Sequence, residues 1–305
     1  MINYCSHGKL LITAEYAVLD GALALAVPTK FGQSLKVQKS TSNTIAWTAY
    51  NSLNEIWFQT KLGLSDTGIE SLEDIAKESN VVKKLREILW EAHLLNPKIL
   101  SGKGYKITTK LDFPNDWGLG SSSTLINNIA QWFGIDAYEL LKNSFGGSGY
   151  DIAAAGNNTP ITYQLNGDTK RVLSAAFNPS FKDEIFFVHL NKKQDSRDAI
   201  AHYKDQPKKT LQSTVEKISA LTENIINCET IGEFNLLIEI HETLISQLIN
   251  TPKVKSELFP EYPGAIKSLG GWGGDFILAT GSEEQKEYFR EKGYNTILSY
   301  KDMVL

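Results

Sequence analysis

Hydrophobic and polar residues alternate along the first sixty positions of the chain. The alternating segments are 9–14, 22–27, 34–39, 44–50 and 55–60, and Gly21, Gly32 and clusters of Ser, Thr and Asn separate them. A period of two places every second side chain on one face of a strand, and Gly and Asn favour the turns between strands. This part of the chain is therefore predicted to form an antiparallel-rich sheet.

In much of the remaining chain, apolar residues recur every three or four positions, which is typical of helices with one buried face. The predicted helices are 69–95, 121–134, 136–143, 150–156, a helix with Leu211, Val215, Ile218, Leu221 and Ile225 on one face, and 231–248. Ser282 and Gln285 have the spacing of a capping box at the start of a last helix. Strands are predicted over 102–113, 184–191 and 296–300.

The mixture of these elements indicates the α+β class with mixed sheets. The pattern changes after Pro179, where a compact strand precedes two long helices. We therefore expect two domains, 1–180 and 181–305. The chain contains no internal repeat and no low-complexity tract.

Composition narrows the class of protein. The chain has 305 residues, of which 42% are hydrophobic and 22% charged, as in ordinary globular proteins. Its net charge of −4 gives no general attraction for nucleic acid, so an anionic substrate must be bound by local Lys or Arg. Two cysteines, Cys5 and Cys228, fit a reducing compartment. Lys9 and Glu15 interrupt the N-terminal apolar run, and no segment reaches the roughly 20 apolar residues of a membrane span, so we expect a cytoplasmic protein.

The most informative motif is Gly-Leu-Gly-Ser-Ser-Ser-Thr at 118–124, which leads directly into the helical pattern over 121–134. Glycines let a backbone approach an anion closely, and the N-terminus of a helix presents amide groups and partial positive charge to it. The motif thus predicts a phosphate-binding loop. Its alternative interpretation is a cluster of N-capping serines on a surface helix.

Three further motifs accompany this loop. Ser-His-Gly-Lys at 6–9 precedes a strand-like run that Glu15 and Tyr16 interrupt, Ser-Gly-Tyr-Asp at 148–151 opens a segment of small residues, and Lys-Ser-Leu-Gly-Gly-Trp-Gly-Gly-Asp occupies 267–275. In this order, the four motifs resemble those of the GHMP kinase superfamily, named for galactokinase, homoserine kinase, mevalonate kinase and phosphomevalonate kinase. The resemblance spans positions 6 to 275 and is strongest for mevalonate and phosphomevalonate kinases.

The resemblance implies a two-domain fold whose N-terminal half is similar to domain 2 of ribosomal protein S5 and whose C-terminal half is ferredoxin-like. It also implies an ATP- and Mg²⁺-dependent transfer of phosphate to a small molecule, with no nucleic acid or membrane as partner. The implied residues are Lys9 and Asp151 for catalysis; Gly118, Leu119, Gly120, Ser121, Ser122 and Ser123 for the nucleotide; Glu15, Tyr16, Ser148, Gly271, Trp272 and Gly273 for the acceptor; and Ser122 and Glu139 for the metal.

Each implied role has its chemical reason and its plainer alternative. Asp151, between small residues, would take the proton of the acceptor hydroxyl, and its alternative is a helix N-cap. Lys9 would lower the pKa of that hydroxyl, and its alternative is one more solvated lysine, since the family's usual Ala-Pro-Gly-Lys is here Ser-His-Gly-Lys. Glu139 is a weak candidate for the metal, because a solvated carboxylate on a helix face is the plainer interpretation.

The acceptor motif favours an anionic intermediate of the mevalonate pathway of isoprenoid biosynthesis. Tyr16 is more like phosphomevalonate kinase than mevalonate kinase, and Trp272 stands where the family has glycine. The basic group Lys192, Lys193 and Arg197 could meet a carboxylate or phosphate, or be a solvated surface. Three alternatives stay open: a decarboxylase of mevalonate diphosphate with the same fold, a kinase acting on a sugar or on homoserine, and a non-catalytic ATP-binding regulatory relative.

Overall fold

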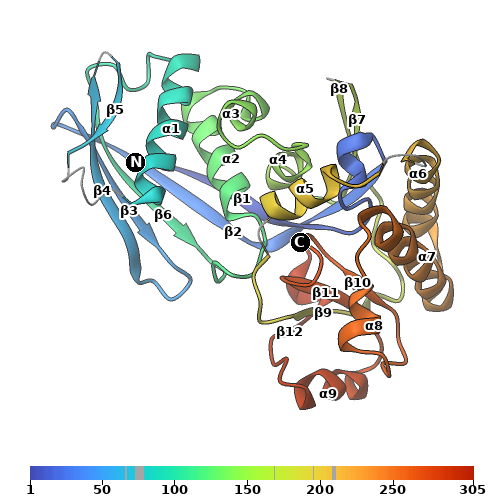
Figure 1. The fold of residues 1–305 in the computed structure, drawn as a ribbon. Helices are drawn as coiled ribbons and strands as arrows, with labels where there is room; N and C mark the ends of the chain where they lie inside the picture. The colour runs from blue at the N-terminus through green and yellow to red at the C-terminus, as the bar shows by residue number, and fades with distance from the viewer. Residues whose placement is uncertain (66, 73–78, 168, 195, 208–210) are drawn as a thin grey trace. The chain divides into compact units, whose positions relative to one another are not determined.

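The structure, a computed structural model, describes residues 1–65, 67–72, 79–167, 169–194, 196–207 and 211–305 (Figure 1). It divides into two compact units. Unit 1 comprises Met1–Gly8, Phe31–Asn115 and Gly120–Gly156, and unit 2 comprises Lys9–Lys30, Asp116–Leu119 and Asn157–Leu305. Both units are discontinuous in sequence, unlike the two consecutive domains predicted above, and the domain boundary near residue 180 stays a prediction.

Unit 1 is built on a sheet with the strand order β5-β4-β3-β6-β2, and β1 also pairs with β2. The strands are β1 (Ile2–Leu11), β2 (Ala24–Ser40), β3 (Thr44–Tyr50), β4 (Ile56–Ser65), β5 (Gly68–Ser71) and β6 (Gly104–Leu111). β3 and β6 are parallel, whereas β2–β6, β3–β4 and β4–β5 are antiparallel. Ile45, Trp47 and Ala49 are buried at every second position of β3, as the alternation predicts.

Four helices of unit 1 pack on one another and lie on one face of this sheet (Figure 1). They are α1 (Asn80–Leu95), α2 (Ser121–Phe133), α3 (Ala137–Ser144) and α4 (Tyr150–Ala155). The core they share with the sheet includes Leu35, Val37, Trp47, Leu62 and Ile107 from the strands and Leu85, Leu89, Ile126, Ile129 and Phe133 from the helices. The apolar stripe of α2 therefore fixes the orientation of the helix whose first residues follow Gly120.

Two predictions about the strands and helices of this sheet were wrong. The segments 22–27 and 34–39 are parts of one continuous strand, β2, and Gly32 lies inside it rather than in a turn. A Cβ atom at Gly32 would stand 2.3 Å from the carbonyl oxygen of Ser6, so glycine is needed for the close approach of β1. The helix predicted from residue 69 begins at Asn80, after the N-cap Ser79, and 68–71 form β5; residues 73–78 of that prediction lie outside the described residues.

Unit 2 contains a four-stranded antiparallel sheet with the order β10-β11-β9-β12. Its strands are β9 (Ile185–His189), β10 (Ile266–Ser268), β11 (Phe276–Thr280) and β12 (Ile297–Ser299). β7 (Ile161–Asn166) pairs with β8 (Thr169–Ser174) and with residues 24–26 of β2. The pattern did not predict β7, β8, β10 or β11; the last two lie beside the glycine motif.

The helical elements of unit 2 are η1 (Ala17–Asp20), η3 (Lys182–Glu184), α5 (Ser196–Lys204), α6 (Leu211–Asn227), α7 (Ile231–Ile249), α8 (Val254–Leu258), α9 (Glu283–Glu291) and α10 (Tyr300–Met303). The face predicted for α6 is confirmed, since Val215, Ile218 and Ile225 are buried. The capping box of Ser282 and Gln285 is also confirmed. Among the described residues, no helix combines the length and the apolar character that crossing a bilayer requires.

Candidate functional site

The glycine-serine loop adopts the geometry that an anion-binding turn requires. α2 begins at Ser121, and its N-cap Gly120 has a φ of 89°, while Gly118 has a φ of 66°. Glycine adopts this left-handed conformation without steric cost. The first turn of α2 contains no acidic residue, so no carboxylate of the helix itself opposes an anion at its N-terminus. The loop crosses from unit 2, which holds Gly118 and Leu119, into unit 1.

The three serines of the loop differ in availability. The Ser123 hydroxyl is buried and donates to the carbonyl oxygen of Gly120 at 2.9 Å. Ser121 is half-buried, and its carbonyl oxygen accepts from the Thr124 hydroxyl at 3.0 Å. Ser122 is exposed, and its hydroxyl forms no hydrogen bond within the described ranges. Ser122 is thus the most exposed of the three serines.

Lys9 lies beside the start of this loop within unit 2. Its main-chain N–H donates to the carbonyl oxygen of Leu119 at 3.0 Å, and its Nζ donates to the carbonyl oxygen of Gly118 at 3.4 Å. The lysine is half-buried at the end of an alternating strand, β1. Its ammonium group is therefore held at the first glycine of the loop.

Asp275, at the end of the second glycine motif, touches the same glycine. A Cβ atom at Gly118 would stand 2.3 Å from Cγ of Asp275. The Oδ1 atom of Asp275 accepts from the Gln194 N–H at 3.1 Å. Burial raises the pKa of the Asp275 carboxyl, and the hydrogen bond from Gln194 and the charges of Lys9 and Lys193 partly oppose this. The sequence analysis included Asp275 only as the last residue of the second glycine motif. Its position directly after several glycines was the available signal that it lies in a tightly packed loop.

In unit 1, Asp151 lies in the first turn of α4. The N-cap is Gly149, with a φ of 85°, so the alternative in which Asp151 caps the helix does not hold. Asp151 is half-buried, and its Oδ1 accepts from the Ile152 N–H at 3.1 Å. Burial and the charges of Asp136 and Asp151 together raise the pKa of Tyr138, on α3, to about 12. Ser148 is half-buried just before the N-cap.

Glu139 is an exposed residue of α3, as expected of a carboxylate on a solvated helix face. It lies in unit 1 and directly follows Tyr138. Its exposure leaves the carboxylate accessible. The prediction that it binds a metal stays a prediction.

Glu15 belongs to a buried ionic cluster in unit 2. Lys267 Nζ bonds to Glu15 Oε1, to Glu242 Oε1 at 3.2 Å and to the Ser268 carbonyl oxygen at 2.9 Å. The two carboxylates and the ammonium are each at most 1% exposed. Burial raises the pKa of Glu15 to about 7; Lys267 opposes this rise and Glu242 adds to it. A carboxylate so enclosed supports its neighbours in the turn rather than meeting solvent.

The turn around Glu15 is strained and held from several sides. Ala14 and Tyr16 have φ values of 67° and 61°, which residues other than glycine seldom adopt. The Ala14 N–H donates to His241 Nε2 at 2.9 Å, so this nitrogen carries no proton. Burial lowers the pKa of His241 well below its usual value, in agreement with a neutral ring. The sequence analysis quoted Lys267 only as the first residue of the second glycine motif and gave no role to His241 or Glu242. The available signal for these two was a polar pair within an apolar helical segment.

The second glycine motif packs against the turn. The Trp272 N–H donates to the Tyr16 hydroxyl at 3.2 Å, and the Trp272 carbonyl oxygen accepts from Gln194 Nε2 at 2.9 Å. Trp272 is 5% exposed. Gly271 is buried and Gly273 half-buried in the same loop. The structure thus brings Trp272 to Tyr16, 256 positions away in sequence. The prediction that these residues and Glu15 bind the acceptor stays a prediction. Lys192 and Lys193 are exposed, and the side chain of Arg197 lies outside the described part of the chain.

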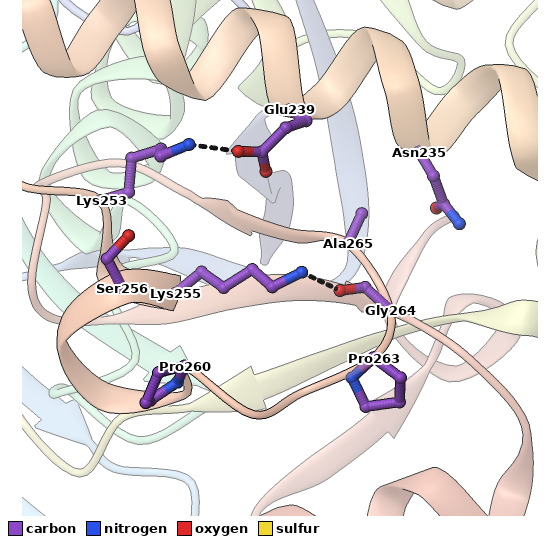
Figure 2. A pocket seen from close by; sticks show the side chains of 9 residues that line it. All are labelled: Asn235, Glu239, Lys253, Lys255, Ser256, Pro260, Pro263, Gly264 and Ala265. Atoms are coloured by element: carbon purple, nitrogen blue, oxygen red, sulfur yellow. Dashed lines mark hydrogen bonds and ion pairs between the residues drawn. The ribbon is translucent and has the colours of Figure 1, made fainter.

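A separate cavity of about 430 Å³ opens beside α7 and α8 in unit 2 (Figure 2). Lys253 is paired there with Glu239, and Lys255 donates to the Gly264 carbonyl oxygen at 2.7 Å. A second cavity of about 610 Å³ lies between α6 and the β7–β8 hairpin. Neither cavity is lined by a residue that the sequence analysis assigned to the site.

No protein-family model matches the sequence, and no curated protein matches it either. Solved structures do match over nearly the whole chain. The phosphomevalonate kinase of Streptococcus pneumoniae, in complex with phosphomevalonate and AMPPNP, superposes with a TM-score of 0.69 at 16% identity, covering 98% of this chain and 100% of that one. The mevalonate kinase of Methanococcus jannaschii gives 0.67 at 15% identity, covering 97% and 96%.

The galactokinase of Lactococcus lactis, in complex with galactose, gives a TM-score of 0.67 at 10% identity, covering 99% of this chain and 93% of that one. The chain has the two-domain GHMP kinase fold. The fold class predicted from the sequence, α+β in the GHMP kinase arrangement, is therefore confirmed. Because kinases with different acceptors share the GHMP kinase fold at comparable scores, the fold does not select the acceptor.

Proposed function

We propose that the protein is an ATP-dependent kinase that phosphorylates a small anionic metabolite. The observation that carries this proposal is Lys9, whose Nζ lies 3.4 Å from the first carbonyl oxygen of the glycine-serine loop. A lysine at a loop of left-handed glycines that opens a helix provides the positive charge that a phosphoryl group needs. The likeness to kinase structures along the whole chain supports the same reaction.

Residues 118–123 would hold the phosphates of ATP, through the amides at the start of α2. Ser122 fits a role as Mg²⁺ ligand because its hydroxyl is exposed, and Mg²⁺ prefers oxygen ligands. Glu139, an exposed carboxylate, is the second and weaker candidate. When bound with ATP, Mg²⁺ would neutralise charge on the phosphates.

Asp151 is the proposed base. It would accept the proton of the acceptor hydroxyl as that oxygen forms a bond to the γ-phosphorus and the bond to the β-phosphate oxygen breaks, releasing ADP. Lys9 would lower the pKa of the hydroxyl and stabilise charge on the transferring group. Asp151 supports this role by being half-buried without being the helix cap.

The proposed acceptor is phosphomevalonate or mevalonate, with phosphomevalonate preferred. Tyr16, the Ser-Gly-Tyr-Asp motif at 148–151 and Asp275 at the end of the glycine motif favour it through the resemblance to phosphomevalonate kinase. Trp272, which bonds to Tyr16 at 3.2 Å, stands where the family has glycine and would reshape the acceptor pocket. The solved neighbours include kinases whose complexes contain phosphomevalonate, mevalonate and galactose, so the choice rests on these residues. Glu15, Ser148, Gly271 and Gly273 are the remaining proposed acceptor residues.

The test is ADP release by the purified protein with ATP and Mg²⁺, over phosphomevalonate, mevalonate, galactose and homoserine. We expect the highest kcat/KM for phosphomevalonate, followed by mevalonate. A preference for galactose or homoserine would refute the acceptor and leave the kinase chemistry standing. Release of CO₂ from mevalonate diphosphate would favour the decarboxylase alternative. No ADP release with any acceptor, from protein that binds ATP, would favour the non-catalytic one.

A further inference from the structure

The indole nitrogen of Trp272 is a buried hydrogen-bond donor without a partner. Its Nε1 atom is shielded from solvent, and no acceptor among the described residues lies within hydrogen-bond distance. Leaving a buried donor unpaired forfeits the hydrogen bonds that it makes with water, and folded proteins contain few such groups. A bound molecule that supplies an acceptor would satisfy this donor.

The backbone that carries this indole is held on both sides. The Trp272 N–H and carbonyl oxygen are bonded to Tyr16 and Gln194. The neighbouring glycines pack tightly as well: a Cβ atom at Gly271 would stand 2.5 Å from Cγ of Gln194, and one at Gly274 would stand 2.8 Å from the carbonyl oxygen of Lys192. The loop therefore cannot move easily to give the indole another partner, and the donor is preorganised.

The charges around this loop favour an anionic acceptor. The Asp275 N–H donates to the Lys192 carbonyl oxygen at 2.7 Å, which joins the glycine loop to a segment with two consecutive lysines. Lys9 and Lys193 both act on the carboxyl of Asp275. Residues 268–274 contain no acidic side chain; of the carboxylates beside them, Asp275 accepts from the Gln194 N–H, and Glu15 and Glu242 are paired with Lys267. An oxygen that arrives here with negative charge is attracted by the lysines, and charge strengthens the hydrogen bond that it accepts.

We propose that the Trp272 Nε1–H donates to a carboxylate or phosphate oxygen of the acceptor molecule. This proposal rests on the proposed kinase function and assigns a binding contact within it. The indole would distinguish an anionic acceptor from a neutral sugar, because only the former brings a charged oxygen to the unpaired donor.

The direct test observes the indole. The chain has six tryptophans, so protein labelled with ¹⁵N-tryptophan gives six indole N–H resonances, and Trp272→Phe identifies the one of interest. If that variant does not fold, Trp→Phe variants at the other five positions assign it by elimination. Titration with inorganic phosphate, mevalonate, phosphomevalonate and galactose follows. We expect the Trp272 resonance to move with mevalonate, which offers a carboxylate, or with the phosphates, and to stay in place with galactose.

The kinetic test uses Trp272→Phe, which keeps an aromatic ring and removes the donor. We expect KM for phosphomevalonate or mevalonate to rise roughly 5- to 100-fold, as for loss of a charge-assisted hydrogen bond, with KM for ATP changed less than about twofold. Trp132→Phe is the matched control, because Trp132 is also buried but lies in unit 1 and packs against Tyr105. A purely structural role would alter both KM values and kcat together.

The outcomes separate the two proposals. An enzyme that releases ADP while its Trp272 resonance ignores every anion, or whose Trp272→Phe variant keeps its acceptor KM, overturns this inference alone. A protein whose resonance responds to anions but which releases no ADP refutes the kinase function and retains the anion contact. A resonance that moves only with galactose overturns the inference and the anionic acceptor together.

Discussion

Gly118 and Asp275 are in direct contact, although 157 positions separate them: a side-chain carbon at Gly118 would overlap Cγ of Asp275 at 2.3 Å. The first glycine of the loop thus serves two purposes. It adopts a φ of 66°, and it leaves room for a buried carboxylate whose pKa burial raises. Glycine at this position lets the start of the glycine-serine loop pack against the end of the second glycine motif, and both residues belong to unit 2.

Gly118→Ala should therefore damage the protein more than a left-handed glycine usually does. We expect a loss of about 2–4 kcal/mol in the free energy of unfolding, combining backbone strain with overpacking, and a fall in ADP release. Gly102→Ala is the matched control, because Gly102 has a φ of 65° with no atom within 4 Å of a Cβ, so it should lose only about 1–2 kcal/mol. Equal losses in urea unfolding would mean that the contact with Asp275 is unimportant.

Asp151→Asn should leave folding and ATP binding intact and lower kcat roughly 10²- to 10⁴-fold, the usual range for a positioned acid–base group. The amide keeps the size of the side chain, and Gly149, not Asp151, caps α4. Steady-state ADP release and calorimetric titration with an ATP analogue measure the two effects. Asp136→Ala, which removes the side-chain acceptor at the N-cap of α3, is the control and should affect stability rather than kcat. Near-normal turnover would remove Asp151 from the mechanism.

Ser122→Ala should raise the Mg²⁺ concentration needed for half-maximal ADP release about tenfold or more, with the thermal midpoint unchanged. Ser122 is exposed and makes no hydrogen bond in the described part of the chain, so its loss costs the fold little. Ser123→Ala should lower the thermal midpoint, because the Ser123 hydroxyl donates to the Gly120 carbonyl oxygen at 2.9 Å. The Mg²⁺ concentration that it needs for half-maximal ADP release should equal that of the wild type. An unchanged Mg²⁺ requirement in Ser122→Ala contradicts the assignment.

Glu15→Gln should remove a pH dependence of stability. The pKa of Glu15 rises from 4.5 to about 7 in the folded protein, so between these values the folded state binds a proton that the unfolded chain has released. The contribution of this proton to the free energy of unfolding is fully present below pH 4.5, and it is lost as the pH rises through 7. Relative to Glu15→Gln, wild-type stability should fall by on the order of 2 kcal/mol between about pH 5 and about pH 8.

Urea unfolding of both proteins across this range provides the measurement. Three titratable residues face Glu15: Lys267, Glu242 and His241, whose Nε2 lies 3.7 Å from Glu15 Oε2. All three remain in the variant. Their contributions therefore largely cancel in the difference. Parallel pH profiles would show that Glu15 is ionised throughout, with Lys267 compensating for its burial.

Local patterns determined much of the fold because they depend on neighbouring residues. The buried face of α6, the capping box at Ser282 and the start of α2 directly after Gly120 all follow from spacings of a few positions. The phosphate-binding prediction for the loop belongs to this class, since two glycines and a helix start are local features. Where a glycine served a distant contact, as Gly32 does with Ser6, the same local interpretation failed.

Tertiary structure alone decided which groups became buried together. Lys267 pairs with Glu15 across 252 positions, and His241 accepts the Ala14 N–H across 227. No local pattern encodes such contacts, because burial and pairing depend on which elements pack after the chain has folded. The same packing raised the pKa of Glu15 and left the Trp272 indole without a partner. The sequence by itself thus determined the motifs and their local geometry, whereas folding determined the electrostatic environment in which they act, because desolvation arises only in the packed protein.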